Sequence, residues 1–140
     1  MVVKKRVTLA LVLVALLIVG VTAFRLAGAA GELEATPNPK ERLALALAQN
    51  KPVFIEFYAD RCPACTAMKP AIAELKRKYG DRIEFILADT DGSGLELAIE
   101  YQVMFIPAYV FINAAGERVG EDLAGYMPKE KLESLLQALL

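Results

Sequence analysis

The stretch "KPVFIEFYADRCPACTAMKP" (residues 51–70) decides the fold, because a strand passes into a helix within it and both cysteines lie at the junction. Its first half, "KPVFIEFYA", is a nearly continuous apolar and aromatic run with Glu56 as its exception, which is typical of a strand covered on both faces of a mixed or parallel sheet. After Cys62 and Cys65, apolar residues recur at helical spacing before Gly80: Met68, Ile72, Leu75 and Tyr79. We therefore expect a central strand followed by a helix over about residues 62–79.

The remaining segments continue this alternation of strands and helices. Asn38 and Pro39 provide an N-cap and a first helical residue for a helix over 39–49. The elements expected downstream are a buried strand at 82–89, a turn at 90–94, a short helix at 95–101, a strand at 108–113, a hairpin turn at 113–117, a strand at 118–123 and a last helix at 128–140. The inner side of that last helix is expected to carry Leu132, Leu135, Leu136, Leu139 and Leu140. This order predicts an α/β domain with a mixed central sheet and helices on both faces.

The first part of the chain forms a separate segment. Three basic residues (4–6) precede an uncharged apolar run from Val7 to Phe24, which as a helix would span about 27 Å, close to the hydrocarbon thickness of a bilayer. We expect one transmembrane helix, with a cleaved signal peptide as the alternative. The basic residues place the N-terminus in the cytoplasm and the domain on the extracytoplasmic side, or free outside after cleavage. The expected organisation is an anchor or signal at 1–30, a linker at 31–37 and a domain at 38–140.

Composition narrows the chemistry of the domain. Lys and Arg total 16 against 17 Asp and Glu, a net charge of -1, so we expect no nucleic-acid partner. Histidine is absent, which excludes Cys/His zinc sites and Cys-His nucleophile pairs. We expect neither a resident metal nor a cofactor.

The position of the two cysteines favours thiol–disulfide exchange. Cys62 is expected at the N-cap of its helix, where free N–H groups and the helix dipole favour a thiolate, and Pro63 suits the first helical position. Arg61 adds a positive charge that acts in the same direction. Cys65, one turn further, is expected to be less exposed, so Cys62 is the candidate nucleophile and Cys65 the resolving thiol. A structural disulfide and a two-thiolate soft-metal site are the alternatives.

Three segments resemble the thioredoxin superfamily over roughly residues 38–140: "FYADRCPACTAMKP" (57–70), "FIPAYVFINAAGERV" (105–119) and "LAGY" (123–126). The resemblance implies a thioredoxin fold in which Pro107 is cis and packs beside the two sulfurs. It also implies that the backbone of Ile106 pairs with the bound substrate chain. Pro70 matches the proline that kinks the active-site helix.

The resemblance assigns a further role to Glu56, which lies where thioredoxins hold a buried aspartate that exchanges a proton with the resolving thiol. A carboxyl among aromatic and aliphatic neighbours has its pKa raised by desolvation, which suits a proton acceptor for Cys65. An exposed glutamate at a strand edge is the alternative. Arg61 replaces the usual tryptophan and is a candidate substrate-binding residue. The segment "KPVFIEFYADRCPAC" (51–65) resembles the exported branch that includes the DsbD C-terminal domain and the thioredoxin-like proteins of cytochrome c maturation.

Together these features predict a membrane-anchored, extracytoplasmic thiol–disulfide oxidoreductase that reduces protein disulfides and draws electrons from a membrane donor of the DsbD/CcdA type. A disulfide-introducing oxidant uses the same fold and the same pair, and the reduction potential separates the two. A non-enzymatic adaptor or metallochaperone that binds a soft metal through both thiolates is the alternative from another class.

Overall fold

The computed structural model describes residues 14–16, 33–121 and 123–140. The chain divides into two compact units, Met1–Glu32 and Leu33–Leu140. Residues 14–16 are helical, and the rest of the transmembrane helix expected within 1–30 lies outside the described residues. Among the residues that are described, no helix is both long enough and apolar enough to cross a membrane.

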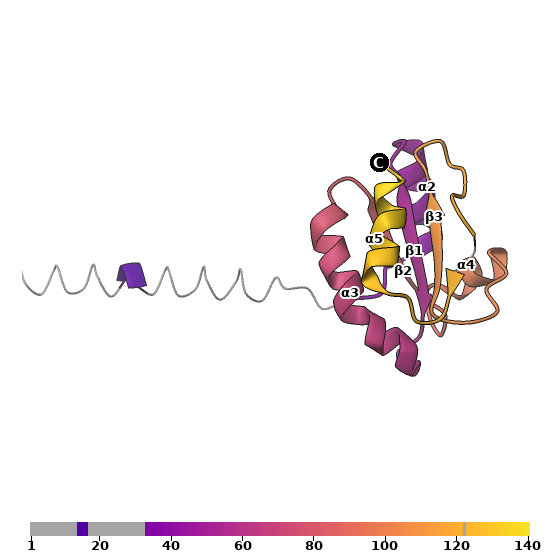
Figure 1. Cartoon of the computed structure of the whole chain (residues 1–140), viewed down its shortest axis with the longest axis horizontal. Helices are drawn as coiled ribbons and strands as arrows, with labels where there is room; N and C mark the ends of the chain where they lie inside the picture. Colours follow the sequence, from indigo (N-terminus) through magenta and orange to yellow (C-terminus); the bar gives the residue numbers. More distant parts are fainter. Residues whose placement is uncertain (1–13, 17–32, 122) are drawn as a thin grey trace, which may run out of the picture. The chain divides into compact units, whose positions relative to one another are not determined.

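The second unit is built on a four-stranded mixed sheet (Figure 1). Its elements in chain order are α2 (Pro39–Ala48), β1 (Val53–Tyr58), α3 (Pro63–Tyr79), β2 (Glu84–Asp89), α4 (Leu95–Glu100), β3 (Ala108–Ile112), β4 (Leu123–Ala124) and α5 (Lys129–Gln137). The strand order is β2-β1-β3-β4, with β1 parallel to β2 and antiparallel to β3, and β4 antiparallel to β3. The predicted mixed sheet with a central first strand is therefore confirmed.

The six residues of β1 are all buried, because helices cover both faces of the sheet. On one face, Phe54 and Tyr58 pack in a cluster with the inner sides of α3 and α5, which lie together in Figure 1. On the other face, Ile55 and Phe57 pack with α2 and α4. The strand alternates between these two clusters, and Glu56 occupies a position between Phe54 and Tyr58 on the face of α3.

The observed elements differ from the predicted ones mainly at their ends. The strand expected at 118–123 is reduced to an isolated bridge between Arg118 and Ile112 and to the two residues of β4, with residue 122 outside the description. Leu140 is 54% exposed, so its predicted inner position is wrong, whereas Leu132, Leu136 and Leu139 are buried as predicted. The last turn of α5 ends at Gln137, before the chain can turn Leu140 inward.

The compact unit begins before the first helix. The Thr36 amide donates to the Leu87 carbonyl at 2.8 Å, and the Leu87 amide donates to Thr36 Oγ1 at 2.9 Å. Leu33 and Ala35 pack against the cluster on the face of α3 and α5. Residues 33–36, which the sequence suggested as part of a linker, are thus attached along the outer edge of β2.

Candidate active site

The cysteine pair lies at the beginning of α3. Cys62 is the N-cap, and its Sγ accepts a hydrogen bond from the Cys65 amide at 3.1 Å. The two residues form a disulfide with their Cα atoms 5.2 Å apart. Cys65 is 1% exposed, while Cys62 is only partly buried, as the predicted division between attacking and resolving thiols requires. Pro63 occupies the first helical position, where its missing N–H group leaves no donor unsatisfied.

A loop before β3 brings the backbone of Ile106 to the cysteines. The Ile106–Pro107 peptide bond is cis, as the resemblance implied. The carbonyl oxygen of Ile106 lies 3.8 Å from Cys62 Sγ. Within the described part of the chain, neither the amide nor the carbonyl of Ile106 takes part in a backbone hydrogen bond, so both are available to an incoming extended chain. The Pro107 carbonyl accepts from the Gly125 amide at 2.7 Å, which fixes the loop against β4.

Glu56 is buried on the same face as Cys65. The carboxylate is 4% exposed and lines a small cavity, called here the Glu56 cavity, with Leu33, Tyr58, Cys65, Lys69 and Leu87. Burial raises the pKa of Glu56 to about 8, and the charge of Lys69 acts in the opposite direction. The predicted burial of Glu56 and the direction of its pKa shift both agree with the structure, and Glu56 and Cys65 line the same cavity.

Arg61 forms an ion pair with Asp91, and its role in substrate binding stays a prediction. Its Nε and Nη2 atoms donate to the two carboxylate oxygens of Asp91, at 2.6 and 2.7 Å. This bidentate pair is exposed and joins the loop before Cys62 to the loop after β2. Because Asp91 offsets the guanidinium charge, Arg61 contributes less positive charge to Cys62 than the sequence alone indicates.

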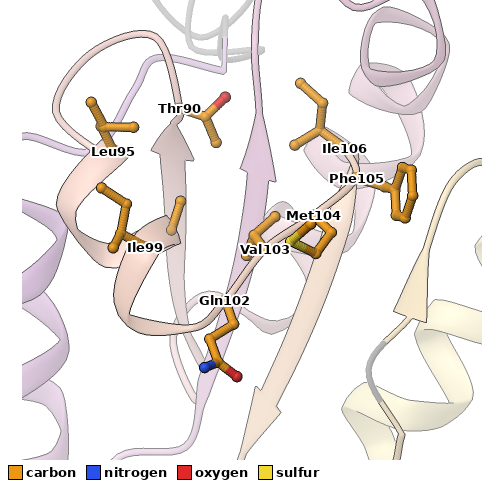
Figure 2. A pocket seen from close by; sticks show the side chains of 9 residues that line it. Thr90, Leu95, Ile99, Gln102, Val103, Met104, Phe105 and Ile106 are labelled. Atoms are coloured by element: carbon orange, nitrogen blue, oxygen red, sulfur yellow. The ribbon is translucent and has the colours of Figure 1, made fainter.

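An apolar groove extends from Ile106 along α4 (Figure 2). The groove has a volume of about 720 Å³, and its lining residues are Thr90, Leu95, Ala98, Ile99, Gln102, Val103, Met104, Phe105 and Ile106. Leu95 and Ile99 project from α4 while Met104 and Phe105 project from the loop that leads to Pro107. Met104 and Phe105 are 81% and 76% exposed, so two adjacent large apolar side chains lie at the surface, an arrangement that is common where partners bind.

The sequence profile of the thioredoxin family matches residues 36–138. The chain belongs to the thioredoxin family. With its cysteine pair at the start of α3, it is a thiol–disulfide oxidoreductase of the thioredoxin type. The solved structure of mitochondrial thioredoxin 3 from Saccharomyces cerevisiae, in its oxidised form, is similar with a TM-score of 0.63 and 27% identity, covering 76% of this chain and 95% of that one.

Two curated relatives are thiol:disulfide interchange proteins. TxlA of Synechococcus elongatus is 35% identical over 132 residues, which cover 94% of this chain and 67% of the relative. The TxlA homolog of Synechocystis is 37% identical over 109 residues, covering 77% of this chain and 60% of the relative. The chain thus spans about two thirds or less of the length of these two thioredoxin-family proteins.

Several residues of the site were not singled out from the sequence. Met104 and Phe105 belong to the apolar segment "VMFIP", whose composition does not distinguish a buried from an exposed loop. Asp91 lies in a turn 30 residues after its partner Arg61, so their pairing depends on the sheet. Lys69 is four residues after Cys65 on α3, and this spacing alone places both side chains on the same side of the helix. Among the described residues, no group of three or more His, Cys, Asp or Glu could hold a metal.

Proposed function

We propose that this protein is a membrane-anchored, extracytoplasmic reductant of protein disulfides. The observation that carries the thiol–disulfide exchange in this proposal is the asymmetry of the pair: the partly exposed Cys62 lies beside the free backbone of Ile106, and the buried Cys65 lines the same cavity as Glu56. The proposal for the location is supported by the basic residues and the apolar run at the N-terminus. The two TxlA relatives are thiol:disulfide interchange proteins, which supports disulfide-bonded proteins as partners of this chain.

In the proposed reaction the Cys62 thiolate attacks a disulfide of the substrate and forms a mixed disulfide, releasing one substrate thiolate. The Ile106 backbone pairs with the substrate chain, while Pro107 keeps that backbone beside the sulfurs. Glu56 takes the proton of Cys65, and the resulting thiolate attacks Cys62 Sγ. This step breaks the mixed disulfide, releases the second substrate thiolate and transfers two electrons in total to the substrate.

The apolar groove provides the surface for the rest of the substrate. Because Ile106, Met104 and Phe105 all line this groove, a chain that pairs with Ile106 has the side chains of Met104 and Phe105 within reach. Arg61 directly precedes Cys62 in the chain and stays exposed in its ion pair with Asp91, so it can contact a substrate bound at Cys62. A membrane electron donor of the DsbD/CcdA type would reduce the disulfide again after each cycle.

The first experiment is reduction of insulin disulfides by the chain with a dithiol donor. We expect activity in the wild type and none in Cys62→Ser. In cells, Cys65→Ala should trap disulfide-bonded partners, because the resolving thiol is absent. Full insulin reduction by Cys62→Ser, or no trapped partner in Cys65→Ala, would contradict the exchange mechanism. Stoichiometric copper or zinc on the purified protein would favour the metal-carrier alternative.

The direction of the reaction needs its own measurement. A reduction potential near that of cytosolic thioredoxins, about -270 mV, fits a reductant, whereas one near about -120 mV fits a disulfide-introducing oxidant. The redox state of the pair in cells, measured by alkylation of free thiols, should be largely reduced if the proposed direction is correct. A fully oxidised pair together with a high potential would reverse the assignment.

A further inference from the structure

The Glu56 cavity and the apolar groove lie on opposite faces of the sheet. Residues of the cavity belong to the cluster beneath α3 and α5, and the groove follows α4. The two share none of their lining residues. A substrate chain that pairs with Ile106, as proposed above, lies beside Cys62, so a proton taken up by Glu56 reaches solvent most directly at a part of the cavity away from that chain.

Lys69 lies at the outer end of the Glu56 cavity. It is one helical turn after Cys65 on α3, so both side chains lie on the same side of the helix. Its ammonium group is 3.0 Å from Asp60 Oδ1 and 5.9 Å from the centroid of the Tyr58 ring. The side chain is 40% exposed and Asp60 is 81% exposed, so the cavity ends at a polar surface where water is available.

The other neighbours of Glu56 bring no positive charge. Cys65 from α3 is neutral in the disulfide, and β2 and the N-terminal segment contribute the apolar Leu87 and Leu33. Tyr58 belongs to β1 itself, and the residue paired with Glu56 across the sheet is Tyr109 of β3. Burial raises the pKa of both tyrosines. Nearby carboxylates raise these pKa values further, Asp89, Asp60 and Glu56 for Tyr58 and Glu56 for Tyr109, so both side chains stay neutral. Leucines of α5 complete the cluster on this face.

We propose that Lys69 is a positioning residue for the redox reaction, and that the proton taken up by Glu56 leaves to solvent at the Lys69 end of the Glu56 cavity. This inference rests on the proposed roles of Glu56 and Cys65. In the step concerned, the Glu56 carboxylic acid gives its proton to water at the cavity mouth, and the Lys69 ammonium stabilises the carboxylate that remains. No bond other than the O–H bond of the acid is broken, and no electron is transferred.

The ion pair with Asp60 determines how strongly the Lys69 charge lowers the pKa of Glu56. The exposed ion pair between them contributes little to stability, so Lys69 can exchange between Asp60 outside and the carboxylate inside. Removal of Lys69 takes the attractive charge away from Glu56. Removal of Asp60 has the opposite effect, because it releases Lys69 toward Glu56 and also removes a negative charge from the cavity mouth. The two members of this ion pair are therefore expected to shift the pKa of Glu56 in opposite directions, whereas an ion pair that does not act on Glu56 would leave its pKa unchanged.

The test measures the Glu56 titration directly in the oxidised 140-residue chain. The carboxyl carbon of glutamate is labelled with ¹³C, and its resonance is assigned by its loss in Glu56→Gln. Lys69→Met should raise the Glu56 pKa by about one unit, and Asp60→Asn should lower it. Lys78→Met is the matched control, because Lys78 lies on the same helix in an ion pair with Glu133, away from the cavity. It should leave the titration unchanged.

The kinetic readout uses the reaction of the reduced chain with 5,5'-dithiobis(2-nitrobenzoate). Attack by Cys62 releases a first coloured thiolate, and resolution by Cys65 releases a second. The pH midpoint of the second phase should move with the Glu56 pKa in each variant, and the first phase should not change. Shifts of the same sign in Lys69→Met and Asp60→Asn, or an equal shift in Lys78→Met, would overturn the inference. Because the ¹³C titration needs no turnover, these results are separate from the insulin assay, whose failure would instead contradict the proposed function.

Discussion

Replacement of Glu56 by glutamine should change how the stability of the domain depends on pH. The acid has a pKa of about 8 in the folded chain, against 4.5 for the ordinary side chain, because it is buried. Between these two values the folded state binds more protons than the unfolded state, so the free energy of unfolding falls as the pH rises. The contribution of protonated Glu56 is fully present below pH 4.5 and is lost as the pH passes about 8.

The size of the effect follows from the separation of the two pKa values. A difference of about 3.5 units corresponds to about 5 kcal/mol over the whole window, and to about 3 kcal/mol between pH 4 and pH 7. Glu56→Gln removes this dependence because the amide does not titrate. A buried amide and a buried acid can also differ in stability by an amount that does not depend on pH. Such a difference shifts the whole curve of unfolding free energy against pH and leaves its slope unaffected.

The assay is urea denaturation of the oxidised protein at half-unit steps from pH 4 to pH 9. The free energy of unfolding of the wild type minus that of Glu56→Gln should fall steadily between pH 4.5 and 8. Glu84→Gln is a control of opposite sign, since hydrogen bonds from Arg42 and Lys51 outweigh burial and lower the Glu84 pKa, so its stabilisation is lost as the pH falls. A wild-type curve parallel to that of Glu56→Gln would refute the assignment of a buried, proton-binding carboxyl.

Three further variants test the groove, the exposed ion pair and the core. Phe105→Ala should raise the KM for a protein disulfide by about tenfold and leave the reaction with a small aromatic disulfide unchanged, because the exposed ring is proposed to contact an extended substrate chain beyond its disulfide. Asp91→Asn frees the Arg61 guanidinium and should speed alkylation of the Cys62 thiol at pH 6 by about twofold. An unchanged rate would show that the guanidinium charge does not act on Cys62. Leu132→Ala should lower the free energy of unfolding by about 2 to 5 kcal/mol, against about 0.5 kcal/mol or less for Leu140→Ala, as measured in urea.

The central elements could be predicted because their signals are local. The apolar run of β1 has no polar face, which specifies a strand covered on both sides, and the spacing of Met68, Ile72 and Leu75 specifies one buried side of α3. Pro63 after Cys62 marks the helix beginning, so the N-cap position of the nucleophile follows from two adjacent residues. Each of these features is decided within one or two turns of chain.

The features that were missed depend on contacts between distant segments. Residues 33–36 have no periodicity, and their attachment to β2 rests on two hydrogen bonds between Thr36 and Leu87. The exposure of Met104 and Phe105 depends on how the loop before Pro107 crosses the end of the sheet. An apolar residue in a loop carries no sign of whether the fold covers it, so the groove became visible only in the assembled domain.

The register of the sheet connects the two faces of the site. Phe57 pairs with Ala108, which places the cis bond of Pro107 at the level where β1 ends and the loop to Cys62 begins. The same register pairs Glu56 with Tyr109 and directs both to the face of α3. A slip of one residue would turn Glu56 toward α2 and α4, away from Cys65, while Cys62 would lose its position beside Ile106. The proposed substrate contact at Ile106 and the proposed proton transfer at Glu56 therefore both depend on one pairing between β1 and β3.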